Sequence, residues 1–330
     1  MSETIEIAPA DGASAGVPTV VRGEHPVLTA PTGALFGLFY MNLLLTVVTL
    51  GVYRFWAKTR LRRFIWRHVT IGGQGFEYTG TGKELLVGFL KALLVLFLPL
   101  FLIGALQLVV GPVWAGWIHI VQVVGVSLLY VIGAYAARRY RMSRTTWGGI
   151  RFRQTGSPWR YVLIYIKGGL LSALTLGLYS PWLRMQLTAY ETINLHYGDV
   201  EFRFTGTGRD LFKRWLIAWL LAVPTLLLSF LWYRALEYRY VAAHTRLAGL
   251  QFAMTLRGRD LFGFYVVNLL IIALSLGILF PLVVRRRIGF WCRWLSLDGT
   301  IDLAAVHQVE RGPRSGEGLA NFFDMDFLGV

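Results

Sequence analysis

The sequence predicts an all-α integral membrane protein with about six transmembrane helices in internal repeats. Three observations predict this fold class: a composition too apolar for a water-soluble surface, five long stretches almost free of charge, and segments that recur along the chain. Hydrophobic residues make up 55 % of the 330 residues and charged residues only 15 %, whereas soluble domains carry about 25 % charged residues. We therefore expect most of the chain to lie in a membrane.

The two ends of the chain differ from its apolar middle. Residues 1–30 are rich in Ala, Pro, Gly, Ser and Thr and slightly acidic, which predicts a flexible N-terminal segment. No basic stretch precedes an apolar run there, so a signal peptide is not expected. The repeated multi-pass membrane domain is predicted over residues 31–305, and residues 306–330 are expected to form a flexible C-terminal tail.

Five apolar stretches lie in the predicted membrane domain, and a transmembrane helix needs about 20 residues. The longest, residues 92–137, contains Gly111 and Pro112 and is long enough for two passes. The other four are residues 34–53, 161–183, 215–233 and 261–284. Tyr and Trp residues flank these stretches, as expected for side chains at the level of the lipid headgroups. The count predicts six helices.

The basic loops predict an orientation, but they leave a conflict. Arginines crowd the loops at 54–84 and 137–160, and the positive-inside rule puts these loops in the cytoplasm and the N-terminus outside. Six single passes then place residues 180–214 outside, together with Arg285–Arg287, against the same rule. A re-entrant hairpin bent at Pro224 would bring the tail back inside. Both arrangements remain open at this point.

Internal repeats are the most informative pattern. Residues 49–82 and 175–208 align without gaps over 34 positions, of which twelve are identical. A second alignment, shifted by 100 residues, matches residues 139–152 to 239–252. The alternation Phe76-x-Tyr78 before a Gly-x-Gly predicts a short Gly-rich strand-like insert at the membrane surface. Duplicated units of this kind are common among secondary transporters.

These repeated motifs carry a family resemblance. The segments that carry it are residues 42–64, 76–89, 175–187 and 202–212. With TLGxYxxW, a basic helix and FxxTGxG in succession, the chain resembles the YjgN-like family of bacterial inner-membrane proteins, whose function is unknown. Residues 275–281 depart from the pattern because they lack its Tyr and Trp. The resemblance implies a multi-pass protein of the bacterial inner membrane and supplies neither an activity nor site residues.

Charge and chemistry narrow the function classes. The formal net charge is +15, which in a soluble protein would suggest nucleic acid. In a membrane protein we expect instead contacts with anionic lipid, and no nucleic-acid partner. A single cysteine excludes an internal disulfide and a Cys-rich metal site. The six histidines are scattered, and no catalytic constellation is visible. We expect no metal, no cofactor and no enzymatic activity.

Lys167 is the candidate residue inside an apolar stretch. An ionisable group in a transmembrane segment is a functional hypothesis by default, and its charge would favour an anionic substrate or headgroup. The competing interpretation is that Lys167 lies close enough to the membrane surface for its long side chain to reach the headgroups.

A second group of candidates lies in and after the first basic helix. Arg60, Arg62 and Arg63 belong to a stretch expected to lie on anionic lipid as an interfacial helix. Gly80 and Gly82 belong to a Thr-Gly-Thr-Gly sequence whose spacing does not fit a P-loop. We interpret it as a turn before a helix, whose backbone N–H groups are able to hold a lipid phosphate.

Two functional hypotheses follow. The first is a transporter or channel-like protein for a small or anionic solute, favoured by the repeats and Lys167. The alternative is a non-transporting envelope protein that binds or organises anionic lipids through its arginine-rich segments. The sequence indicates neither a substrate nor an oligomeric state.

Overall fold

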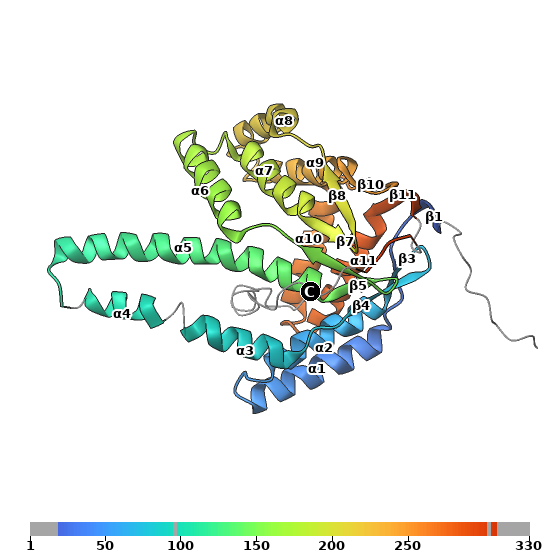
Figure 1. Cartoon of the computed structure of the whole chain (residues 1–330), viewed down its shortest axis with the longest axis horizontal. Helices are drawn as coiled ribbons and strands as arrows, with labels where there is room; N and C mark the ends of the chain where they lie inside the picture. The colour runs from blue at the N-terminus through green and yellow to red at the C-terminus, as the bar shows by residue number, and fades with distance from the viewer. Residues whose placement is uncertain (1–18, 95–97, 108, 302–304, 309–330) are drawn as a thin grey trace, which may run out of the picture.

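The chain folds as pairs of helices that alternate with short antiparallel strands, as the computed structural model in Figure 1 shows. The structure describes residues 19–94, 98–107, 109–301 and 305–308. We call each set of helices with the strands that follow it a unit, and the described part of the chain contains five.

The units follow one another along the chain. The first holds α1 (Thr32–Val48), α2 (Arg54–Arg67), β3 (Val69–Ile71) and β4 (Gln74–Tyr78). The second holds α3 (Gly82–Ala92), α4 (Leu98–Leu106), α5 (Pro112–Ser143), β5 (Thr145–Trp147) and β6 (Ile150–Gln154). The third holds α6 (Pro158–Leu174), α7 (Ser180–Ile193), β7 (Leu195–Tyr197) and β8 (Val200–Phe204). The fourth holds α8 (Gly208–Leu220), α9 (Ser229–Ala243), β9 (Thr245–Leu247) and β10 (Leu250–Met254). The fifth holds α10 (Gly258–Leu274), α11 (Phe280–Trp294) and β11 (Leu295–Ile301).

Two further strands come before the first unit and join the two edges of the sheet. β1 (Thr19–Glu24) and β2 (Val27–Leu28) lie within the segment expected to be a flexible lead-in, of which residues 1–18 are outside the described residues. The eleven strands form one sheet in the order β1-β11-β10-β9-β8-β7-β6-β5-β4-β3-β2. Because its edge strands are consecutive in the chain, the sheet curves until both edges reach the same connection.

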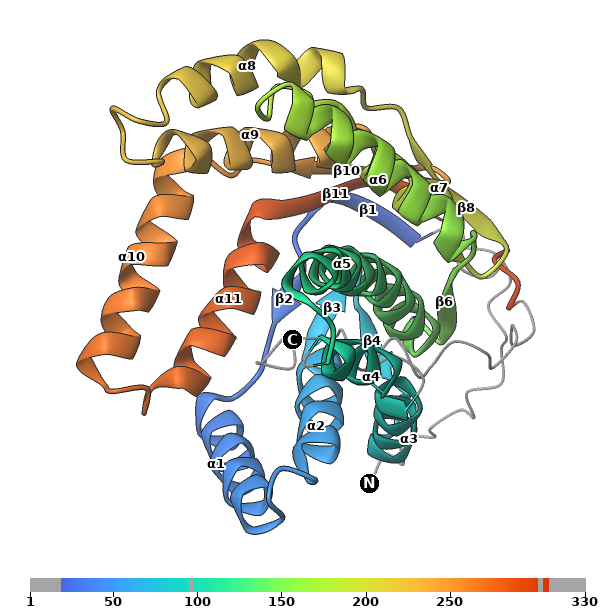
Figure 2. The ribbon, with the colours of Figure 1, turned by 90° about the vertical axis from the view of Figure 1, so that its left-hand side faces the viewer.

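The helices follow the same closed path. The last helix of each unit packs against the first helix of the next, and α11 packs against α1. Figure 2 shows this succession of helices around the molecule, with the α4–α5 hairpin directed towards the viewer. All five units therefore present their strands at one end and their helix-to-helix turns at the other.

Aromatic side chains fill the inside of the curved sheet. Phe76 pairs with Trp147 across β4 and β5, and Phe152 pairs with Tyr197 across β6 and β7. These side chains belong to one cluster that also reaches Ile301 on β11. Fully burying a large apolar side chain stabilises the fold by about 1.5–3 kcal/mol. Since successive residues of a strand point to opposite faces, the charged residues between these positions lie on the outer face.

The prediction of an all-α protein with about six transmembrane helices is wrong. An eleven-stranded sheet joins all the units, and the strand-like insert expected at Phe76-x-Tyr78 is part of it, as is the aligned segment at 202–204. Among the described residues, one helical segment, Trp114–Ser143 of α5, is long and apolar enough to cross a membrane.

The physical reason is a turn inside the apolar stretches. Residues 161–183, expected to form one straight helix, contain α6, a turn at 175–179 and the start of α7. The same reversal divides 261–284 between α10 and α11. An apolar run of 20 residues satisfies the length rule for a transmembrane helix, but a left-handed residue in its middle sends the chain back.

The predicted orientation changes with the fold. The N-terminal strands and the segments 54–84 and 180–214 all contribute to one sheet, so they cannot lie on opposite sides of a membrane. The prediction of an N-terminus on the side opposite to the 54–84 loop is therefore wrong. The alternative with a hairpin near Pro224 describes the observed path from α8 to α9.

Candidate membrane-contact surface

In four units the turn that joins the two helices has the same form and carries an exposed leucine. We call these residues the leucine tips: Leu50, Leu176, Leu226 and Leu276, which are 94, 76, 84 and 91 % exposed. Their φ angles lie between 48° and 50°, in the left-handed region that costs a non-glycine residue about 1–2 kcal/mol. Such strain is characteristic of functional positions. The surroundings of the tips are also apolar and exposed.

The turns satisfy their own backbone polar groups. Thr49 Oγ1 donates to the Leu45 carbonyl at 2.7 Å and accepts from the Tyr53 N–H at 2.9 Å. The hydroxyls of Thr175, Thr225 and Ser275 make the same pair of hydrogen bonds. A helix end normally leaves several N–H and C=O groups to water. Hydroxyl capping on both sides of the turn is what a chain reversal in hydrocarbon requires.

The second unit carries a long hairpin in place of the short turn. α5 has 32 residues, or about 48 Å at 1.5 Å per residue, against a hydrocarbon core of about 30 Å. Only 28 % of the most apolar part of this helix is buried inside the molecule, so most of that part faces outwards. Gln122 joins the two arms: its Nε2 donates to the Leu100 carbonyl at 3.0 Å, and its Oε1 accepts from Gln107 Nε2 at 3.2 Å. Figure 1 shows this hairpin extending beyond the other turns.

Exposed basic side chains lie about one helix length behind the tips. Arg60, Lys167 and Arg214 are ten, nine and twelve residues from the tip of their own unit, or roughly 14–18 Å at 1.5 Å per residue. Lys91, on the long hairpin, is also exposed. We call these four residues the basic belt. Half of a hydrocarbon core is about 15 Å, so tips at the middle of a bilayer place the basic belt among the headgroups.

Two of the residues predicted from the sequence belong to this belt. Lys167 is exposed on α6, and among the described residues it makes no hydrogen bond or ion pair. The Nη1 of Arg60 donates to the Tyr53 hydroxyl at 2.6 Å, and its guanidinium lies 5.9 Å from the ring centroid. Both side chains lie on the outer surface of separate hairpins.

The other four predicted residues have structural roles at the sheet end. Arg62 is 1 % exposed and packs over the ring of Tyr78, so it offers no surface to a headgroup. The Nη2 of Arg63 donates to the Gly80 carbonyl at 3.1 Å, which joins α2 to the turn after β4. At Gly82 a Cβ would lie 2.8 Å from the Trp56 Cα. These contacts give the four residues structural roles, and the expectation that they hold a lipid phosphate stays a prediction.

Sequence reasoning missed two glutamates that form ion pairs with arginines. Glu237 on α9 is 4 % exposed and accepts from Arg184 Nε at 2.6 Å and from Arg234 Nη1 at 2.9 Å. Glu84 on α3 forms an ion pair with Arg144 at 3.1 Å. The available signal was the scarcity of acidic residues: in a chain with so few, each one on a helix is a candidate partner for arginine. Within the described residues no cluster of His, Cys, Asp or Glu is arranged to hold a metal ion.

The comparisons with known proteins identify the family. Residues 27–231 and 220–322 match a family described as a bacterial protein of unknown function, DUF898. The first match alone covers more than half of the chain. The chain belongs to this family. It is 36 % identical over 77 residues to the Inner membrane protein YjgN of Salmonella typhimurium, which is 23 % of this chain and 20 % of that protein.

A second relative agrees. The Inner membrane protein YjgN of Escherichia coli strain K12 is 28 % identical over 130 residues, 39 % of this chain and 31 % of that protein. The chain thus matches at most about a third of the length of these relatives. No solved structure matches it. The predicted resemblance to the YjgN-like family is confirmed, and the chain is a protein of the bacterial inner membrane.

Proposed function

We propose that this YjgN-like protein binds and organises anionic phospholipid in one leaflet of the inner membrane, without transporting a solute. It inserts its four leucine tips into that leaflet and crosses the membrane with the α4–α5 hairpin. The observation that supports this most directly is the set of leucine tips, because strained and exposed leucines at four matching turns are costly in water. In hydrocarbon their exposure has no such cost.

The charges favour the cytoplasmic leaflet. The strands lie at one end of the molecule and carry exposed arginines such as Arg203 and Arg246, and the formal net charge is +15. The positive-inside rule retains such a surface on the cytoplasmic side. With the tips near the middle of the bilayer, the basic belt then meets the headgroups of that leaflet.

The chemistry of the basic belt selects an anionic headgroup. Guanidinium groups bind phosphate through two parallel N–H···O bonds, and ammonium groups bind it as point charges. A Lys or Arg near an anionic surface contributes about 1 kcal/mol to membrane binding. Four belt residues on different hairpins would therefore enrich anionic lipid all around the molecule.

The test measures the lipid that accompanies the protein. The protein is extracted in polymer-bounded membrane discs, and its anionic phospholipid fraction is compared with that of the bulk membrane. We expect enrichment for the wild type and loss of enrichment for Arg60→Gln combined with Lys167→Gln. The matched control is Arg203→Gln with Arg246→Gln, which removes the same charge from two exposed strand residues at the sheet end.

The same protein distinguishes the transport hypothesis. Purified protein is reconstituted in vesicles of phosphatidylethanolamine and phosphatidylglycerol, and entry of chloride or phosphate is followed. Flux that depends on Lys167, without lipid enrichment in the discs, would overturn the proposal in favour of a transporter for a small anion. Enrichment without flux supports the lipid-organising function.

A further inference from the structure

The fourth unit differs from the others at its turn. α8 has 13 residues, whereas α1, α6 and α10 have 17 each. Pro224 lies in the turn after α8, and Leu227, with a φ of 67°, stands where three other units have glycine. α8 ends six residues before its leucine tip, whereas α1, α6 and α10 end two residues before theirs, and residues 221–228 form turns instead of helix.

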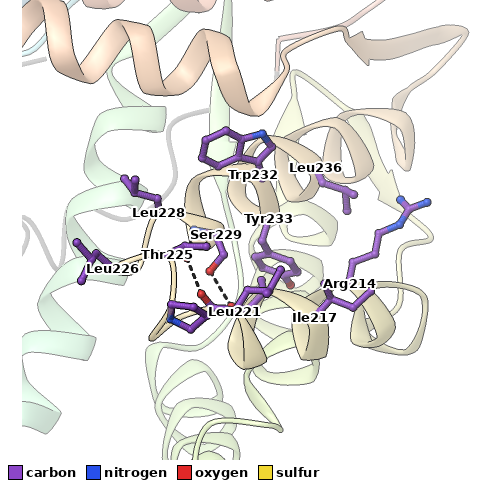
Figure 3. A pocket seen from close by; sticks show the side chains of 12 residues that line it. Arg214, Ile217, Leu221, Thr225, Leu226, Leu228, Ser229, Trp232, Tyr233 and Leu236 are labelled. Atoms are coloured by element: carbon purple, nitrogen blue, oxygen red, sulfur yellow. Dashed lines mark hydrogen bonds between the residues drawn. The ribbon is translucent and has the colours of Figure 1, made fainter.

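An open groove lies between α8 and α9. Its volume is about 720 Å³, within the range of about 300–1,000 Å³ usual for small-molecule sites. The walls are almost entirely apolar and include Ile217, Leu221 and Trp232. Figure 3 shows Leu226 at one end of the groove and Arg214 at the other. The groove therefore runs from a leucine tip to the basic belt.

The polar groups of the groove are unevenly satisfied. Ser229 Oγ donates to the Ala218 carbonyl at 2.7 Å, and Thr225 Oγ1 donates to the Leu221 carbonyl at 2.6 Å. These bonds leave the middle of the groove apolar. Arg214 is exposed and, within the part of the chain that the structure describes, makes no hydrogen bond or ion pair. A long apolar wall with an unpaired cation at one end matches an amphiphile with an anionic head.

We propose that the α8–α9 groove holds one acyl chain of an anionic phospholipid whose phosphate pairs with Arg214. This inference rests on the proposed function and deepens it, because it assigns one specific lipid site within a surface that attracts lipid generally. The occupant is a phospholipid because the groove is continuous with the surface proposed to enter the bilayer, and because its end at Arg214 lies at headgroup depth. The guanidinium geometry suits a phosphate.

The first test separates Arg214 from general charge. Delipidated protein in mild detergent is titrated with phosphatidylglycerol, and bound lipid is counted by native mass spectrometry. We expect one lipid to bind more tightly than the rest, and Arg214→Gln to weaken that lipid about tenfold or more, as for loss of a charge-assisted hydrogen bond. Arg214→Lys should retain part of the affinity. Arg209→Gln, on the same helix but outside the groove, is the control and should leave the tight lipid in place.

The second test fills the groove without changing charge. Leu221→Trp places an indole ring, which is larger than the leucine side chain, on an exposed position of the wall. This variant should abolish tight lipid binding while the unfolding temperature stays near that of the wild type. Equal tight binding by the wild type, Arg214→Gln and Leu221→Trp would overturn the inference, as would equal binding of phosphatidylethanolamine.

The two proposals fail in different ways. If Arg214→Gln keeps the tight lipid while membrane discs still show anionic enrichment, the groove assignment is wrong and the proposed function stands. If the wild type shows no anionic enrichment in discs, the proposed function is wrong.

Discussion

A glycine stands at the first position of three helices because a tryptophan of the preceding helix pair leaves no room for a side chain. A Cβ on Gly82, Gly208 or Gly258 would lie 2.8, 2.5 or 2.8 Å from the Cα of Trp56, Trp182 or Trp232. Real Cβ atoms do not approach backbone so closely. The glycines therefore set the distance at which one unit packs on the next.

This contact predicts a stability difference between two glycines in the first turn of a helix. Gly208→Ala should destabilise the protein by about 1–3 kcal/mol, the usual cost of overpacking, because the clash is with the backbone of Trp182. Gly33→Ala is the control, since a Cβ there meets nothing within 4 Å. Thermal unfolding in detergent measures both. Equal unfolding temperatures for the two variants would contradict the packing argument.

We expect His196 on β7 to make the stability of the fold depend on pH. Its Nε2 lies 2.9 Å from Thr155 Oγ1, Arg153 pairs with it across the strands, and Glu201 is 3.9 Å away. Burial, followed by the charge of Arg153, lowers the pKa of His196. The unfolded chain then binds more protons than the folded one just below about pH 6.5, so stability is retained above that pH and falls as the pH drops through the folded-state pKa.

We expect the unfolding temperature to fall between about pH 7.5 and pH 5, and to fall less in His196→Gln, which does not titrate. Arg246→Gln provides a comparison, because it removes a strand charge elsewhere on the sheet. A pH response of His196→Gln as large as that of the wild type would assign the effect to other groups.

At the scale of elements, sequence patterns predict where the chain is apolar better than they predict where it turns. The stretches at 161–183 and 261–284 are apolar as expected, but each contains a reversal at Leu176 or Leu276. Thr-Leu-Gly is an ambiguous signal, because leucine rarely adopts positive φ and the hydroxyl caps are visible only in three dimensions. Arg62 illustrates the same limit: its burial depends on the ring of Tyr78, which comes from a later strand.

The hairpin turns predict a depth in the bilayer. In a Cys292→Ala background, a spin label at Leu176→Cys should report a position near the bilayer centre, accessible to oxygen and shielded from a water-soluble nickel reagent. Val109→Cys, in the connection between α4 and α5, is expected at the far headgroup level, since its hairpin is longer. Full access of the nickel reagent to Leu176→Cys would contradict insertion of the leucine tips.

At the scale of the whole molecule, the common sheet places all the strand-bearing segments on one side of the membrane. In intact cells an impermeant maleimide should label Val109→Cys from outside. Arg203→Cys should react only after the inner membrane is made permeable, because β8 lies in the same sheet as β3 and β4. Labelling of Arg203→Cys from outside would contradict this arrangement and support a chain that crosses the membrane in six single passes.

Membrane character and family could be predicted from the sequence, but the closed arrangement of units could not. The first depends on composition and on motifs such as Thr-Gly-Thr-Gly, which are local. Closure depends on β1 and β2, six and two residues long, in a segment whose composition suggests a flexible tail. Successive units also differ in length, and the alignments at residues 49–82 and 139–152 each compare units that are not adjacent in the chain.

The pairing of β1 with β11 has a consequence for how the chain is made. Thr19 leaves the ribosome some 280 residues before its partner Ile301. Throughout synthesis the growing sheet keeps a free edge, which invites pairing with other chains, and its final contact is as non-local as the fold allows. A nascent chain that stops before β11 leaves β1 without its partner. Such a chain keeps an unpaired strand edge and is prone to aggregate.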